Sequence, residues 1–116
     1  MLISNNTFLS DWKIMSSYPL ISILMTVYNN ESTIAESLNS IKKQTYTNWE
    51  LIIINDGSKD NTLNLIKNFK SEVSNQVTII NNEINLGINL SLNLGIDHIK
   101  GDYVARQDGD DISTNN

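Results

Sequence analysis

The feature that most constrains the fold is a pair of short, nearly continuous apolar stretches, residues 20–27 and 49–55. The second contains the uninterrupted run Leu51-Ile52-Ile53-Ile54. A strand with one face in water alternates apolar and polar residues, so a continuous apolar run predicts a strand that is buried on both faces. Such strands occur in parallel sheets whose two faces are covered by helices. The two stretches therefore predict an α/β fold.

The segments that follow these strands have the apolar spacing of amphipathic helices. In the first segment the apolar positions are Ile34, Ala35, Leu38 and Ile41. In the second segment they are Leu65, Ile66 and Phe69. Thr33 and Glu36 have the spacing of a capping box at the start of the first helix, and Ser58 is a candidate cap for the second.

Two further strands are predicted at residues 77–80 and 103–106, and the segment between them is ambiguous. Its apolar residues alternate as in a strand from Ile88 to Ile96, yet Ile88, Leu92, Ile96 and Ile99 also fit one face of a helix. Parallel neighbours need a crossover of about a dozen residues or more, usually a helix, so we interpret this segment as a helix. The resulting order predicts one domain over residues 19–116, after an N-terminal arm or linker at residues 1–18.

Composition excludes several classes of protein. Eight basic and thirteen acidic side chains give a net charge of −5, which argues against a nucleic-acid partner or an anionic-membrane patch. The chain has no cysteine, so disulfides and thiolate metal sites are excluded. Polar residues interrupt the start of the chain where a signal peptide needs an apolar run, and no run approaches the ~20 residues that span a bilayer. We therefore expect a cytoplasmic protein, and leave open a peripheral position on the inner membrane face for a full-length form.

Polar residues gather directly after three of the predicted strands, at residues 26–31, 55–58 and 108–111. Parallel strands end at the same edge of a sheet, and open α/β sheets bind ligands there. The last cluster, Asp108-Gly109-Asp110-Asp111, places three carboxylates within four residues, where they repel one another. A divalent cation removes that repulsion, and oxygen ligands suit Mg²⁺ or Mn²⁺. The alternative is a solvated acidic loop.

Other nucleotide-binding and metal-binding patterns are missing. The sequence contains neither G-x-G-x-x-G nor G-x-x-x-x-G-K-[ST], so a dinucleotide fold of the Rossmann type and a P-loop are not supported. An EF-hand loop needs glycine at its sixth position, whereas Gly109 is second in its cluster. A receiver-type signalling domain needs an acidic pair after the first strand, where this chain has Tyr28-Asn29-Asn30.

Several stretches, in order along the chain, resemble the inverting glycosyltransferases of family 2. They are residues 19–31 (PLISILMTVYNNE), 44–50 (QTYTNWE), 54–62 (INDGSKDNT), 85–87 (NLG), 93–95 (NLG) and 101–113 (GDYVARQDGDDIS). The resemblance implies the GT-A fold, whose nucleotide-binding half would be present here and truncated after the strand that carries the D-x-D motif. It also implies a nucleotide-sugar donor, most often a UDP-sugar, and a divalent cation, Mg²⁺ or Mn²⁺.

The resemblance also assigns roles to individual residues. Thr26 and Tyr28 would line the uracil pocket, and Asp56 would accept a hydrogen bond from the base. Asp108 and Asp110 match the D-x-D pair that contacts the ribose and holds the metal on the diphosphate. The candidate metal ligands are Asp110 and Asp111, and Arg106 and Gln107 would approach the donor from the fourth strand.

Two departures from the family's pattern bear on function. Asn55 stands where many relatives have aspartate, and because Asp56 is kept we expect donor binding to survive. No residue matches the acidic catalytic base, which in the family lies downstream of the position of Asn116. The resemblance implies an enzyme that transfers a sugar, with inversion and a divalent cation, from the nucleotide donor to a saccharide or other hydroxyl acceptor. We therefore expect this chain to carry the donor-binding half only and not to complete the transfer by itself. The alternative is a non-catalytic nucleotide-binding remnant of a truncated or split gene.

Overall fold

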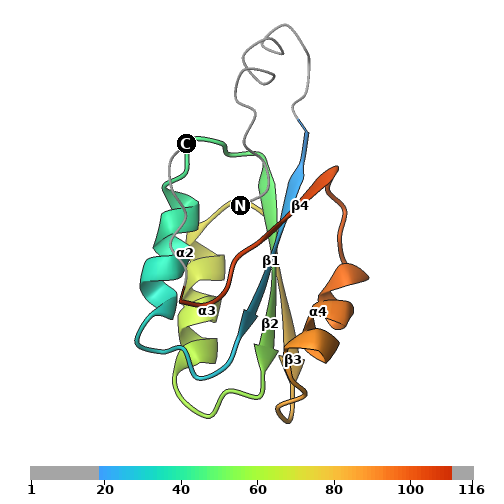
Figure 1. Ribbon diagram of the computed structural model, residues 1–116. Coiled ribbons are helices and arrows are strands. Elements are labelled where there is room, and N and C mark those ends of the chain that lie inside the picture. The colour runs from blue at the N-terminus through green and yellow to red at the C-terminus, as the bar shows by residue number, and fades with distance from the viewer. Residues whose placement is uncertain (1–18, 111–116) are drawn as a thin grey trace, which may run out of the picture.

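The structure, a computed structural model, describes residues 19–110 and contains a four-stranded parallel sheet with three helices (Figure 1). The elements in chain order are β1 (Ile21–Val27), α2 (Ile34–Lys42), β2 (Trp49–Asp56), α3 (Thr62–Glu72), β3 (Val77–Asn82), α4 (Ile88–Ile96) and β4 (Tyr103–Arg106). The strand order across the sheet is β3-β2-β1-β4. The predicted alternation of strands and helices is confirmed, and the ambiguous segment is a helix. The predicted arm at residues 1–18 lies outside the described residues.

The two central strands are covered on both faces, as their apolar sequences predict. Helices α2 and α3 pack on one face of the sheet and α4 packs on the other (Figure 1). Along β2 the side chains alternate between the two cores, so that Leu51 and Ile53 face α2 and α3 while Ile52 and Ile54 face α4. All four residues are fully buried, each with 0% of its surface exposed. No helix among residues 19–110 has the length and apolar character needed to cross a membrane.

The two predicted helix caps are wrong. Thr33 is at the N-cap position of α2, but its hydroxyl makes no cap bond and donates instead to the carbonyl of Gly109, at 3.2 Å. Helix α3 begins after Asn61, and the Ser58 hydroxyl accepts a hydrogen bond from the Asn29 N–H at 3.0 Å. Both hydroxyl groups therefore join loops at the carboxyl end of the sheet, because the tertiary fold brings other polar backbone groups within their reach.

Gly57 makes the turn after β2 possible. Its φ of +78° is in the left-handed region that glycine adopts without steric strain. A Cβ atom at this position would lie 2.7 Å from backbone atoms of Ile84 and Asn85, so the segment between β3 and α4 packs directly on the turn. The close approach places that segment beside the end of β2, at the rim where ligands of α/β sheets bind.

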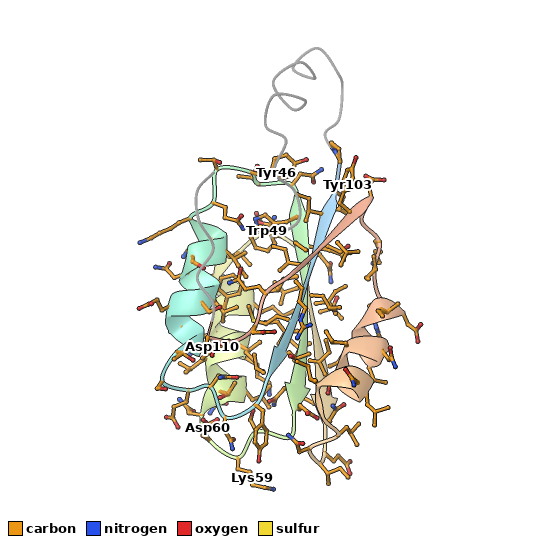
Figure 2. The ribbon with its side chains drawn as sticks, in the orientation of Figure 1. Tyr46, Trp49, Lys59, Asp60, Tyr103 and Asp110 are labelled. Carbon is orange, nitrogen blue, oxygen red and sulfur yellow. The ribbon has the colours of Figure 1, made fainter. Side chains whose placement is uncertain are left out.

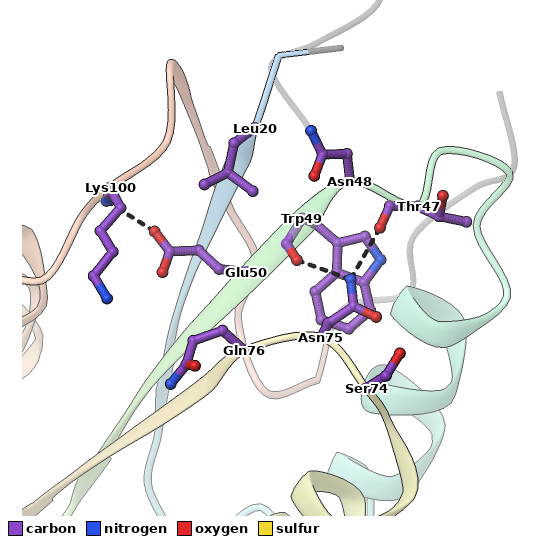
Figure 3. A pocket seen from close by; sticks show the side chains of 9 residues that line it. All are labelled: Leu20, Thr47, Asn48, Trp49, Glu50, Ser74, Asn75, Gln76 and Lys100. Carbon is purple, nitrogen blue, oxygen red and sulfur yellow. Dashed lines mark hydrogen bonds between the residues drawn. The ribbon is translucent and has the colours of Figure 1, made fainter. Parts of the chain in front are cut away.

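A buried carboxylate joins three segments at the opposite, amino end of the sheet. Glu50, on β2, is only 2% exposed, and its Oε2 accepts hydrogen bonds from the Ser22 hydroxyl at 2.5 Å and from the Lys100 N–H at 2.8 Å. The Lys100 contact borders a hollow of about 520 Å³ at this end (Figure 3). Because both donors come from outside β2, Glu50 ties β1 and the segment before β4 to the central strand.

Glu50→Ala should lower the free energy of unfolding by about 2–3 kcal/mol, since it leaves the buried Ser22 hydroxyl and the part-buried Lys100 N–H without their acceptor. The matched control is Glu83→Ala, because Glu83 is exposed, and this variant should stay within about 0.5 kcal/mol of the wild type. Urea denaturation of the three proteins measures both effects. Equal stability of the two variants would contradict the structural role of Glu50.

Candidate functional site at the carboxyl end of the sheet

Four segments meet at the carboxyl end of the parallel sheet: residues 28–33 after β1, 57–61 after β2, 83–87 after β3 and 107–110 after β4. Figure 2 shows Lys59, Asp60 and Asp110 toward this end, and Tyr46, Trp49 and Tyr103 toward the other. The clusters that the sequence places after three strands therefore lie on one rim, as predicted.

Asp56, at the end of β2, anchors the segment between β3 and α4. The residue is 4% exposed, its Oδ1 accepts from the Leu86 N–H at 2.7 Å and the Asn82 amide at 2.9 Å, and its Oδ2 accepts from the Gly87 N–H at 2.9 Å. Burial raises the pKa of Asp56, but the hydrogen bonds from these three donors and from the Ser91 side chain together hold the pKa below its ordinary value of 3.8. The group is thus a fixed negative charge with part of its acceptor capacity already used.

Thr26 and Tyr28 lie close to Asp56 in the register of the sheet. Thr26 pairs with Ile54 across β1 and β2, and the alternation of side chains puts Thr26 and Asp56 on the face that α4 covers. Tyr28 follows the last residue of β1, and its backbone N–H donates to the Asn30 side chain at 2.8 Å. Its ring is on the surface, with the residue 46% exposed. A half-exposed aromatic ring beside a buried carboxylate can stack on a planar base that also offers an N–H donor.

Asn55 lies on the other face of the sheet from Asp56. Its amide donates to the Asn81 side-chain oxygen at 3.1 Å, between β2 and β3. A carboxylate at this position has no such donor to offer when ionised. The departure at Asn55 therefore lies on the face of the sheet opposite the Asp56 carboxylate, where the amide links β2 to β3.

Backbone contacts to α2 hold the acidic segment after β4. The carbonyl of Asp108 accepts from the Ser37 hydroxyl and that of Gly109 accepts from the Thr33 hydroxyl, both at 3.2 Å. Gln107, predicted to approach the donor, is instead buried against α2, where its amide donates to the Ser37 hydroxyl at 3.0 Å. The side chain therefore serves to fix this segment.

The Asp108 and Asp110 side chains supply the oxygen chemistry that a divalent cation requires. Both are at the rim, and the Arg106 guanidinium lies 3.4 Å from the Asp108 carboxylate. Within residues 19–110 no three His, Cys, Asp or Glu side chains are grouped closely enough to hold a metal on their own, and Asp111 lies outside these residues. Mg²⁺ usually takes one or two carboxylates and completes its shell with substrate phosphates, and this pair fits that pattern.

Sequence reasoning missed the hydrogen bonds that link the loops of the rim. Asn29, Asn30 and Glu31 contact Ser58, Lys59, Asp60 and Thr62 through backbone and side-chain groups. Asn and Asp in turns commonly bond to nearby backbone, so the sequence signals turns there without showing their partners. The sequence likewise did not show that the Asp56 carboxylate accepts hydrogen bonds from Leu86 and Gly87, although Asn85-Leu86-Gly87 is one of the stretches that resemble family 2.

Comparison with protein families shows that the family model described as glycosyl transferase family 2 matches residues 22–116. Curated relatives include the putative glycosyltransferase EpsE of Bacillus subtilis, 46% identical over 99 residues, which are 85% of this chain and 36% of EpsE. Another is the Escherichia coli UDP-Glc:alpha-D-GlcNAc-diphosphoundecaprenol beta-1,3-glucosyltransferase WfgD, 38% identical over 80% of this chain and 36% of its own. The chain spans about a third of the length of these relatives.

Solved structures share the fold. The mannosyltransferase PcManGT from Pyrobaculum calidifontis, in complex with GDP-Man and Mn²⁺, superposes with a TM-score of 0.77 at 22% identity, over 84% of this chain and 29% of that one. S. aureus TarS in complex with UDP has a TM-score of 0.73 at 27% identity, over 79% of this chain and 28% of that one. The arrangement of strands and helices is therefore that of these larger enzymes.

The Asp56 anchor predicts a pH-dependent contribution to stability. Because its pKa is lowered in the folded state, its stabilisation is complete above the unfolded-state value and is lost as the pH falls through the folded-state value. Asp56→Asn, which exchanges one acceptor oxygen for an amide, should cost about 2 kcal/mol at neutral pH. That difference from the wild type should shrink as the pH falls below the ordinary value of 3.8. Urea unfolding from neutral pH to about pH 3 measures the effect.

The control for this series is Asp97→Asn, in which an exposed carboxylate at the end of α4 is changed in the same way. It should follow the wild-type curve throughout. An Asp56→Asn difference that stayed constant down to the lowest pH would show that the carboxylate charge does not act on the β3–α4 segment.

Proposed function

The chain belongs to glycosyl transferase family 2, and we propose on that premise that it binds the nucleotide-sugar donor of an inverting transfer, with UDP as the nucleotide and Mg²⁺ or Mn²⁺ on the diphosphate. The observation that carries the proposal is the convergence at one rim of a half-exposed tyrosine, a buried carboxylate and an acidic pair. These groups are Tyr28, Asp56, Asp108 and Asp110. The relative TarS was solved with UDP, and WfgD is named for a UDP-Glc donor.

The nucleobase would lie between Tyr28 and Asp56. The Asp56 carboxylate accepts from Asn82, Leu86 and Gly87, and a hydrogen bond from the Ser91 side chain also lowers its pKa. As a fixed negative charge at the end of β2, it would attract the N–H of a uracil ring. Tyr28 would offer the face of its ring to the base, and Thr26 would line the pocket beneath it.

The diphosphate would lie at the acidic segment. Asp108 and Asp110 would hold the cation, with Asp111 as a further candidate ligand outside the described residues. When bound, the cation supplies Lewis-acid stabilisation of the charge that develops on the departing diphosphate. The hydroxyls of Thr33 and Ser37 hold the backbone carbonyls of Gly109 and Asp108, and this would limit the movement of the segment when phosphate binds.

The transfer itself requires a general base near the acceptor hydroxyl, and we assign that role to no residue of this chain. The donor half of the reaction is what these residues account for: recognition of the nucleotide and stabilisation of the leaving group. The acceptor would be a saccharide or another hydroxyl compound.

Binding of UDP should depend on a divalent cation and on Asp110. Calorimetry with UDP should show binding with Mn²⁺ present, and Asp110→Ala should weaken it roughly tenfold or more, equivalent to about 1.4 kcal/mol. Asp97→Ala is the matched control and should bind like the wild type, because Asp97 is the residue that follows α4, on the face of the sheet opposite the α2 contacts of the acidic segment. Equal UDP affinity with Mn²⁺ and with a chelator would overturn the metal assignment.

Tyr28→Ala should also weaken UDP binding, because base stacking on an aromatic side chain contributes about 1–3 kcal/mol. Tyr28→Phe keeps the ring and should retain most of the affinity. A titration of both variants at saturating Mn²⁺, with GDP in a parallel series, measures the contribution of the ring and the preference for uracil. If Tyr28→Ala binds UDP as well as the wild type does, the ring has no part in the site.

A further inference from the structure

Two neighbouring loops of the rim are joined by a reciprocal pair of hydrogen bonds at Asn29. The Asn29 backbone N–H donates to the Ser58 hydroxyl at 3.0 Å, and the Asn29 side-chain oxygen accepts from the Lys59 N–H at 2.8 Å. One residue of the segment after β1 therefore both donates to and accepts from the segment after β2. Lys59 and Asp60 mark that second segment at the lower end of the molecule in Figure 2.

The backbone of Asn29 is in a conformation that is unusual for a residue other than glycine. Its φ is +51°, and among residues 19–110 it is the one non-glycine residue with positive φ. Asparagine tolerates this left-handed conformation better than other side chains do, because its short amide can bond to nearby backbone. Here the amide bonds to Lys59 in the adjacent loop. The Asn29 side chain thus both favours the left-handed backbone and makes the contact with Lys59.

The turn at Asn29 determines where the preceding residue points. Tyr28 stands between the last residue of β1 and this turn, and its N–H is held by the Asn30 side chain at 2.8 Å. The phenol ring is half exposed and extends from this backbone to the surface. A change in the backbone of Asn29 would therefore act on the position of the ring through the chain itself, without removing a group that would contact the nucleotide.

Other contacts keep the loop folded when the Asn29 side chain is removed. The Asn30 N–H donates to the Thr62 hydroxyl at 2.9 Å, and the Glu31 N–H donates to the Asp60 carboxylate at 3.2 Å. The Thr62 hydroxyl in turn donates to Asp60 at 2.5 Å. These bonds do not involve Asn29, so the segment stays attached to α3 while the turn that carries Tyr28 is loosened.

We propose that Asn29 is a positioning residue for the nucleobase, holding Tyr28 in the orientation that stacks on the ring of UDP. The inference rests on the proposed function. A ring that is fixed before the ligand arrives loses less conformational freedom on binding, and affinity rises accordingly. Asn29 acts through Tyr28 and does not itself touch the ligand.

The test is a double-mutant cycle between Asn29 and Tyr28, with the dissociation constant of UDP at saturating Mn²⁺ as the readout. Asn29→Gly permits positive φ but removes the acceptor of the Lys59 N–H, and it should weaken UDP binding roughly five- to tenfold. In the Tyr28→Ala background the same substitution should change the affinity by less than about twofold, because the ring is already gone. Asn29→Asp keeps the acceptor and should restore near wild-type affinity.

A second variant approaches the same contact from the other loop. Ser58→Ala removes the acceptor of the Asn29 N–H and leaves the Asn29 side chain in place, so its effect should also disappear in the Tyr28→Ala background. The matched control is Asn75→Gly, at the amino end of the sheet. The Asn75 amide joins segments there by donating to the carbonyls of Thr47 at 2.9 Å and Trp49 at 2.8 Å (Figure 3). This control should lower the melting temperature and leave the UDP affinity unchanged.

The outcomes separate the inference from the proposed function. An equal loss of affinity on Asn29→Gly with and without the Tyr28 ring would overturn the positioning role alone. Loss of UDP affinity in Asn75→Gly to the same extent would show that any weakening of the fold suffices, and would also overturn it. If the wild-type chain fails to bind UDP with Mn²⁺, the proposed function falls, and the inference falls with it.

Discussion

Burial of β1 and β2 on both faces is the constraint on which the rest of the structure depends. Each strand needs apolar neighbours above and below. The chain provides them because, after each strand, a helix packs on the sheet and returns the chain to the amino end, where the next strand begins. Helices α2 and α3 cover one face and α4 covers the other. Because every strand then runs in the same direction, the polar residues after β1, β2 and β4 are delivered to one rim. The site is thus a consequence of how the core is built.

The rim itself is held together by polar groups that satisfy one another. The Asp56 carboxylate fixes the β3–α4 segment, hydroxyls on and before α2 fix the acidic segment, and Asn29 joins the first two loops. Buried or half-buried backbone groups need partners, and in these loops the partners come from neighbouring loops more than from regular secondary structure. The same bonds that satisfy the backbone also determine the directions in which the functional side chains point.

Asp56 illustrates how one residue combines both tasks. Its hydrogen bonds with Asn82, Leu86, Gly87 and Ser91 tie β3, α4 and the segment between them to β2, and they lower its pKa, which keeps the group ionised. The same negative charge is what a base N–H would use. On the proposed function, substitution of Asp56 should change stability and nucleotide affinity together, whereas substitution of Tyr28, an exposed ring, should leave the fold largely untouched. The two residues can be told apart experimentally for this reason.

The sequence by itself determined the architecture and the location of the site. The continuous run Leu51-Ile52-Ile53-Ile54 required a strand buried on both faces, and apolar spacing with the crossover rule decided the helices, including α4. The stretches at residues 19–31, 54–62 and 101–113 resemble family 2 and so predicted the GT-A fold, and their polar residues follow three of the strands. These signals are local, or repeat along the chain at a fixed period, and a sequence records both kinds directly.

Only the tertiary structure decided which polar groups meet. Thr33 and Ser58 have the sequence signature of helix caps, yet their hydroxyls bond to Gly109 and Asn29 from other loops. Gln107 is turned into the core beside α2, and the left-handed backbone of Asn29 follows from its contacts with Ser58 and Lys59. A short hydroxyl or amide side chain can bond to any polar group within about 3 Å, and local sequence does not say which groups come that close. That choice is made when the sheet brings the ends of its strands together.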